Sequence, residues 1–69
     1  MSIEHKKEFG IYHWDTFDNE TIFLHEENKL ADAEKWVTEH YGNRIKPNGA
    51  DQCDIVNKAG DIVRKFSIG

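Results

Sequence analysis

The chain has 69 residues, 38% of them hydrophobic and 32% charged, and a formal net charge of −4 at pH 7. This length and composition predict one globular domain over residues 1–69 and disfavour a disordered chain. The single cysteine excludes an internal disulfide, no apolar run approaches the roughly 20 residues that span a bilayer, and the start "MSIEHKKEFG" lacks the apolar core of a signal peptide. We therefore expect a cytoplasmic protein with no membrane segment.

The charge is unevenly divided along the sequence. Residues 1–42 hold four Lys or Arg and ten Asp or Glu side chains, whereas residues 43–69 hold five and three. An acidic first half repels polyphosphate, so a general nucleic-acid binder is disfavoured. A basic strip in the second half keeps a small nucleic-acid-binding domain open as the alternative, and its members are Arg44, Lys46, Arg64 and Lys65.

The first elements in the chain are predicted to be two strands of a hairpin. Residues 1–8 are polar and are expected to form a frayed arm or an extension of the first strand. Alternating side chains predict strands over residues 9–15 and 21–26, with "DTFDNET" as the turn between them.

A two-residue tip at Asp18 and Asn19 sets the register of this hairpin. It pairs Trp14 with Phe23, Tyr12 with His25 and His13 with Leu24. One face then carries Tyr12, Trp14 and Phe23, and the other carries Ile11, Ile22 and Leu24. Large apolar side chains on both faces mean that each face meets a packing partner.

The clearest helix covers the stretch "NKLADAEKWVTEHYG". Its apolar stripe at helical spacing consists of Leu30, Ala33, Val37 and either His40 or Tyr41, with Trp36 beside it. Asn28 is the predicted cap at the start, and Gly42 is the predicted left-handed stop.

A loop, "NRIKPNGADQ", and a second hairpin follow the helix. "CDIV" and "DIVRKFSI" are predicted strands joined by "NKAG", with Gly60 closing the turn in a bulge. The register places Val56 opposite Ile62 and Asp54 opposite Arg64. The predicted fold is therefore α+β, a four-stranded antiparallel ββαββ sheet with one helix packed on one face.

The C-terminal part of the sequence resembles small bacterial and phage domains of the YegP-like and DUF2188-like kind. The segment "DIVNKAGDIVRKFSIG" and the helical "DAEKWV" contribute the likeness, through Ile55, Asn57, Gly60, Ile62, Ser67 and Gly69. The resemblance implies a ββαββ domain that is often paired or duplicated. It implies no catalytic residue.

No residue pattern indicates catalysis, a metal or a cofactor. The four histidines lack the spacing of a zinc helix, and the predicted register places His13 and His25 on opposite faces. Cys53 lies in no nucleophile signature and is interpreted as a small buried hydrophobe. We therefore expect neither an enzyme nor a metal- or cofactor-binding protein.

The remaining interpretation is an interaction module that binds an unidentified protein partner and forms a homodimer. Carboxylates crowd the first hairpin and would contact a basic partner: Asp15, Asp18, Glu20, Glu26 and Glu27. The hairpin side chains expected to mediate self-association or partner binding are Ile11, Tyr12, Trp14 and Phe23. One specific hypothesis is a phage or mobile-element inhibitor that occupies the nucleic-acid-binding groove of a host defence or regulatory protein.

Overall fold

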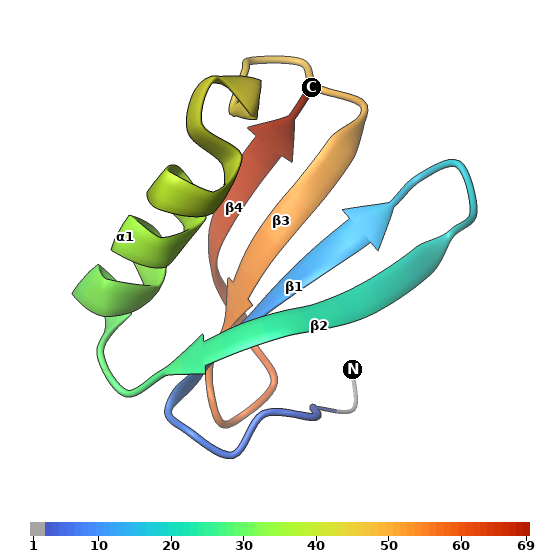
Figure 1. Cartoon of the computed structure of the whole chain (residues 1–69). Coiled ribbons are helices and arrows are strands. Elements are labelled where there is room, and N and C mark those ends of the chain that lie inside the picture. The colour runs from blue at the N-terminus through green and yellow to red at the C-terminus, as the bar shows by residue number, and fades with distance from the viewer. Residues whose placement is uncertain (1–2) are drawn as a thin grey trace.

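The computed structural model describes residues 3–69, which form a four-stranded antiparallel sheet with one helix against it (Figure 1). The elements are β1 (Phe9–Asp15), β2 (Glu20–Glu27), α1 (Leu30–Tyr41), the 3-10 turn η1 (Gly42–Arg44), β3 (Asp51–Val56) and β4 (Ile62–Ile68). The strand order is β2-β1-β3-β4, so the two hairpins meet along β1 and β3. The predicted ββαββ arrangement is confirmed. Met1 and Ser2, part of the expected arm, lie outside the described residues.

The first hairpin has a different register from the predicted one. Tyr12 pairs with Phe23, His13 with Ile22 and Trp14 with Thr21, and residues 16–19 form the loop. The predicted pairs of Trp14 with Phe23, Tyr12 with His25 and His13 with Leu24 are therefore wrong. Near the loop the ladder is shifted by an even number of residues, which keeps these side chains on their predicted faces because strand side chains alternate with a period of two.

A bulge in β2 changes the faces further from the loop. The ladder resumes with Ile11 opposite His25, which leaves Leu24 as the extra residue. Leu24 packs against the main core, and the His25 ring stacks on Trp36 of α1 with centroids 4.8 Å apart. His25 therefore lies on the helix side of the sheet, and the prediction that it lies opposite to the face of His13 is wrong.

Helix α1 buries the stripe that its spacing predicts. Its buried residues are Ala33, Val37 and Tyr41, with Leu30 and Trp36 partly buried against the core. Of the two alternatives at the end of the stripe, Tyr41 is buried and His40 is exposed. Gly42 ends the helix with a positive φ of 56°, so the predicted glycine stop is confirmed, although its ψ of −126° lies outside the left-handed helical region. The cap at the start is Lys29, with no side-chain hydrogen bond, so the prediction of an Asn28 cap is wrong.

The main core lies between α1 and the central strands. Ile11 of β1, Cys53 and Ile55 of β3 and Ile68 of β4 are buried there against the helix stripe. Adjacent ladder positions bring Ile11 opposite Ile55, so the central strands place their apolar side chains under the helix. Burial of these branched side chains is the main stabilising contribution, about 25 cal/mol per Å² of apolar surface removed from water.

The second face of the sheet is partly covered by the segment that precedes β1. His5 is 4% exposed, its Nδ1 lies 2.7 Å from the Tyr12 hydroxyl, and its Nε2 lies 3.1 Å from the carbonyl oxygen of Asn57. Gly10 provides the space, since a Cβ there would collide with the His5 imidazole. Beneath it Tyr12 and Val56 are buried. The expected arm thus forms no strand. His5, Tyr12 and Val56 make up a small second core on this face of the sheet.

Glu26 of β2 ties the same segment to the sheet. Its Oε1 accepts hydrogen bonds from the backbone N–H groups of Lys6, at 2.8 Å, and Lys7, at 2.9 Å. These two donors are the first cause that lowers the pKa of the Glu26 carboxyl. The segment before β1 is therefore held at three consecutive residues, His5 by its own imidazole and Lys6 and Lys7 by the Glu26 carboxylate.

The second hairpin agrees in part with its predicted register. Val56 pairs with Ile62 as expected, and Gly60 has a positive φ of 88°. A bulge after Ile55 shifts the rest of the ladder, so Asp54 pairs with Lys65 and the predicted Asp54–Arg64 pair is wrong.

Candidate protein-interaction surface

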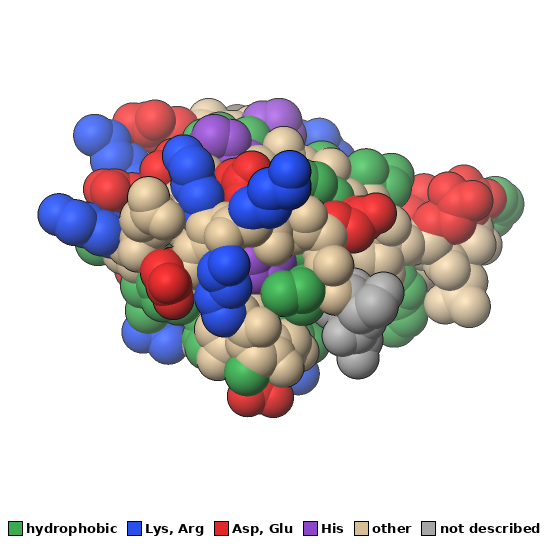
Figure 2. Space-filling model, turned by 90° about the horizontal axis from the view of Figure 1, so that it is seen from below, with side chains coloured by type: hydrophobic (Ala, Val, Ile, Leu, Met, Phe, Trp, Pro, Cys, Tyr) green, Lys and Arg blue, Asp and Glu red, His purple; other side chains and the backbone are tan. Residues whose placement is uncertain are grey.

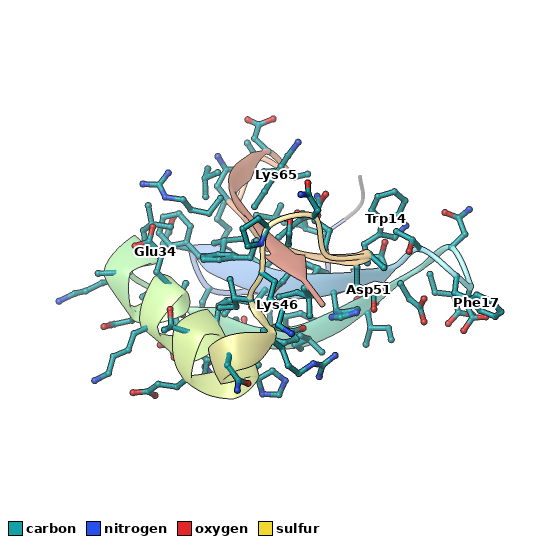
Figure 3. All side chains as sticks on the ribbon, turned by 90° about the horizontal axis from the view of Figure 1, so that it is seen from above. Trp14, Phe17, Glu34, Lys46, Asp51 and Lys65 are labelled. Atoms are coloured by element: carbon teal, nitrogen blue, oxygen red, sulfur yellow. The ribbon has the colours of Figure 1, made fainter. Side chains whose placement is uncertain are left out.

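The end of the β1–β2 hairpin projects from the body of the molecule (Figure 1). Its loop, residues 16–19, carries Phe17, whose side chain is 94% exposed and points away from the sheet (Figure 3). An aromatic ring of this size contributes nothing to the fold when it stands in water. Such a ring is typical of an anchor that a partner buries.

The loop that presents Phe17 is ordered by its own hydrogen bonds. The carboxylate of Asp15 accepts the N–H of Phe17, at 2.9 Å, and the N–H of Asp18, at 3.4 Å. Asn19 adopts a φ of 54°, and its side-chain oxygen lies 3.4 Å from the indole N–H of Trp14. Asparagine tolerates this positive φ better than most residues, so it suits the last position of the loop.

The base of the loop is fastened to the start of β3. The Thr16 hydroxyl donates to the carbonyl oxygen of Ala50 at 2.8 Å. The Thr16 N–H donates to Oδ1 of Asp51 at 3.4 Å, and the Thr16 hydroxyl lies at the same distance from that oxygen. Asp51 therefore connects the β1–β2 hairpin with β3, the first strand of the second hairpin.

Asp51 is held in turn by a side chain of the sheet. Its Oδ2 lies 3.2 Å from Nε2 of His13, whose Nδ1 lies 2.6 Å from the hydroxyl of Tyr41 at the end of α1. The hydrogen bond from His13 is the first cause that lowers the pKa of the Asp51 carboxyl. We call Tyr41, His13, Asp51 and Thr16 the hairpin relay, because they run from the helix end to the base of the loop.

Carboxylates surround the exposed ring. Figure 2 shows acidic side chains gathered around a projecting end of the molecule, with a hydrophobic side chain at its extremity. Among residues 3–69, no hydrogen bond or ion pair involves the carboxylates of Asp18 and Glu20. Both are exposed and available to a basic partner.

The other members of the predicted acidic patch have structural contacts. Asp15 orders the loop, Glu26 binds the segment before β1, and Oε2 of Glu27 lies 2.6 Å from Nε2 of His25. The structure therefore brings Asp15, Asp18 and Glu20 together at the loop and leaves Glu26 and Glu27 at the opposite end of β2.

The hairpin residues predicted for association differ in how accessible they are. Ile11 and Tyr12 are 0% and 2% exposed, so their side chains offer no surface to another molecule. Trp14 is 37% exposed on the side of the sheet away from α1 (Figure 3), and Phe23 is partly buried beside Tyr12, with ring centroids 5.3 Å apart. Ile22 on β2 is 48% exposed.

The basic residues of the second half do not form one strip. Nε of Arg64 lies 2.6 Å from Oε1 of Glu34 on α1, whereas Lys65 lies on the opposite side of the sheet (Figure 3). Arg44 lies over the Tyr41 ring, 5.6 Å from its centroid. Lys46 follows η1 and, like Arg44, lies beside Gly69, so Arg44 and Lys46 are neighbours while Arg64 and Lys65 lie on opposite sides of the sheet.

Two of the histidines, His25 and His40, lie closer together than the sequence predicts, because their rings stack on opposite sides of Trp36. Trp36 lies between the His25 and His40 rings, with centroids 4.8 and 4.5 Å away. A shallow depression of about 210 Å³ beside them is lined by Glu27, Asp32, Lys35, Trp36 and Glu39. Within residues 3–69, no three His, Cys, Asp or Glu side chains form a group that could hold a metal ion.

Cys53 lies under the helix, opposite His13 on the neighbouring strand. Its side chain is 0% exposed, and burial raises the pKa of the thiol to about 12. A thiol in this state is protonated and inert at neutral pH, which supports its interpretation as a small buried hydrophobe.

The sequence alone predicts neither the exposure of Phe17 nor the contacts of the hairpin relay. A two-residue tip would have placed Phe17 in the ladder opposite Glu20, with half of its surface covered. Five polar or acidic neighbours around one aromatic residue, in "DTFDNE", were the available signal. The relay joins residues 13, 16, 41 and 51, which no local pattern connects.

Comparison with protein-family models, with curated proteins and with solved structures found no match to this chain. The resemblance to YegP-like and DUF2188-like domains therefore stays a prediction. No helix among the described residues has the length and apolar character needed to cross a membrane.

Proposed function

We propose that the protein is a non-catalytic module that binds a protein partner through the end of the β1–β2 hairpin. The observation that supports this most directly is the 94% exposure of Phe17 on a loop held by hydrogen bonds. Burial of such a ring at an interface removes a large apolar surface from water, and a preordered loop loses little conformational entropy on binding.

The chemistry of the partner surface follows from the neighbours of the ring. Asp18 and Glu20 present carboxylates beside Phe17, so a complementary surface carries an apolar pocket with Lys or Arg at its rim. A basic rim of this kind is typical of nucleic-acid-binding grooves. An inhibitor that occupies such a groove, of phage or mobile-element origin, is the specific form of the proposal.

An affinity capture from nuclease-treated lysate tests the proposal with three baits. They are the parent protein, the variant Phe17→Ser and the control variant Ile62→Ser, which changes another exposed apolar residue, 40% exposed on β4. We expect a protein that the parent and control retain and that Phe17→Ser loses, because truncation of an interface anchor costs about 2 kcal/mol or more, a roughly 30-fold loss of affinity.

The fold should survive this substitution, since Phe17 makes no buried contact. Circular dichroism and the melting temperature verify this. Equal capture by all three baits contradicts the role of Phe17. Retention of an oligonucleotide with steep salt dependence would favour the nucleic-acid-binding alternative instead.

A further inference from the structure

We propose that the hairpin relay presents Phe17 to its partner, with Asp51 as the positioning residue at its centre. The inference rests on the proposed function for its consequence in binding. The positioning itself is a property of the isolated protein, and it can be measured without a partner.

The argument begins with the position of Thr16. It is the first residue of the loop and precedes Phe17 directly, so its backbone sets the direction in which the aromatic ring leaves the hairpin. Both polar groups of Thr16 are bound outside the hairpin, the N–H by Asp51 and the hydroxyl by the carbonyl oxygen of Ala50 at 2.8 Å. These hydrogen bonds therefore fix the loop relative to β3 as well as to its own strands.

The second step concerns what holds Asp51. A surface carboxylate that accepted only the bonds of Thr16 would keep its own torsional freedom. Here Oδ2 lies 3.2 Å from His13, and the His13 ring is stacked on Tyr41, with centroids 5.7 Å apart, and lies 2.6 Å from its hydroxyl. Because Tyr41 is 5% exposed in the core, the relay connects the loop with a rigid part of the molecule.

The two halves of the loop then have separate supports. Asp15 accepts the N–H groups of Phe17 and Asp18 from within the hairpin, while Asp51 and Ala50 hold Thr16 from β3 and the loop before it. A loop with only the internal support could swing about its base. The external support fixes the angle at which Phe17 is presented, which lowers the entropy lost on binding.

The first experiment measures backbone motion by 15N NMR on the isolated protein. Thr16→Val removes the hydroxyl donor at an exposed position, and Thr21→Val on β2 is the matched control. Asp51→Ala removes the acceptor, and Asp61→Ala is its control on the other hairpin. We expect lower heteronuclear NOE values at residues 17–19 for Thr16→Val and Asp51→Ala, and parent values for both controls.

A conservative variant separates positioning from general stability. Asp51→Asn keeps an oxygen that can accept from Thr16, so its loop should be more ordered than that of Asp51→Ala. If Asp51→Ala does not fold, His13→Phe decides, because it removes the bond that holds Asp51 and keeps an aromatic ring beside Tyr41. Parent-like NOE values at residues 17–19 in Asp51→Ala, or in His13→Phe where Asp51→Ala does not fold, would overturn the positioning role.

The second experiment measures affinity for the protein whose capture depends on Phe17. We expect Thr16→Val and Asp51→Ala to weaken binding roughly 3- to 10-fold, through loss of preorganisation. Parent affinity in a variant whose loop is mobile would overturn the link to binding. If no captured protein depends on Phe17, the proposed function fails, while the NMR result still decides whether the relay orders the loop.

Discussion

Gly60 occupies a backbone conformation that few other residues adopt. Its φ of 88° lies in the left-handed region, where a β-branched side chain is strongly disfavoured. We expect Gly60→Val to lower the free energy of unfolding by more than the ~1 kcal/mol of an ordinary change. Urea denaturation measures the loss.

The control for this prediction is Ala59→Val at the neighbouring exposed position, where φ is not positive. It introduces the same side chain without the backbone strain, so its unfolding midpoint should stay close to that of the parent. Equal midpoints for the two variants would show that the turn tolerates a side chain at residue 60.

The pH response of Asp51 is a second property that one residue determines. Its pKa is lowered from 3.8, first by the hydrogen bond from His13. A carboxyl with a folded pKa below its unfolded pKa stabilises the fold above the unfolded value, and this contribution is lost as pH falls through the folded pKa. We expect His13→Gln to move the Asp51 titration midpoint upward toward 3.8.

Carboxyl 13C NMR between pH 6 and pH 2 measures this midpoint directly. Glu26 is the internal control, because its pKa is lowered by the backbone N–H groups of Lys7 and Lys6 and not by His13. An Asp51 midpoint unchanged by His13→Gln would contradict the bond between the two side chains.

At the scale of elements, the acidic residues of the first hairpin divide into two groups. Asp18 and Glu20 repel one another across an exposed loop, so Asp18→Asn with Glu20→Gln should leave the unfolding midpoint unchanged or slightly raised. Glu26→Gln should lower it, because a charged acceptor of two backbone N–H groups is lost. Urea denaturation at pH 7 compares the variants.

The same double variant should also change binding. Neutralised carboxylates steer a basic partner less, so association should slow at low salt and its salt dependence should flatten. Stopped-flow measurements at two salt concentrations test this with the captured partner. Unchanged rates at both concentrations would assign recognition to Phe17 alone.

How much of the structure could be predicted also depends on scale. Alternation and helical spacing predicted strand β1 with its observed bounds and the buried positions Ala33 and Val37, and left Tyr41 as one of two candidates for the end of the stripe, because each depends on side chains a few residues apart. The bulge at Leu24 could not be predicted, because it follows from packing against α1 and from no turn residue in the sequence. His25 changed face for that reason.

For the candidate site, the acidic character of the hairpin was predictable and its geometry was not. Phe17 became an exposed tip residue through a four-residue loop whose first residue, Thr16, is bound to Ala50 and Asp51. Asp51 was predicted to lie in the loop after the helix, whereas it begins β3 and binds His13. Both depend on contacts between residues far apart in the chain.

For the whole molecule, we predict a homodimer. Trp14, on the face away from α1, is 37% exposed, and Ile22, on the other face, is 48% exposed, so both faces of the projecting hairpin present an apolar side chain that favours association. Light scattering at high micromolar concentration should give twice the 8.1 kDa chain mass, and Trp14→Ala should reduce it. Ile62→Ser is the control on β4. A monomer of 8.1 kDa at this concentration would contradict the dimer.

The rate at which a reagent labels the buried Cys53 thiol measures how often the native structure opens. Cys53 is the only cysteine, it is 0% exposed, and it is protonated while it stays under the helix. A thiol reagent at pH 8 can therefore react only with molecules in which α1 has separated from the sheet, and the labelling rate counts those openings. We expect labelling to accelerate with the destabilisation that Gly60→Val causes, without any introduced probe. Rapid labelling of the native parent protein would instead show that α1 separates readily from the sheet.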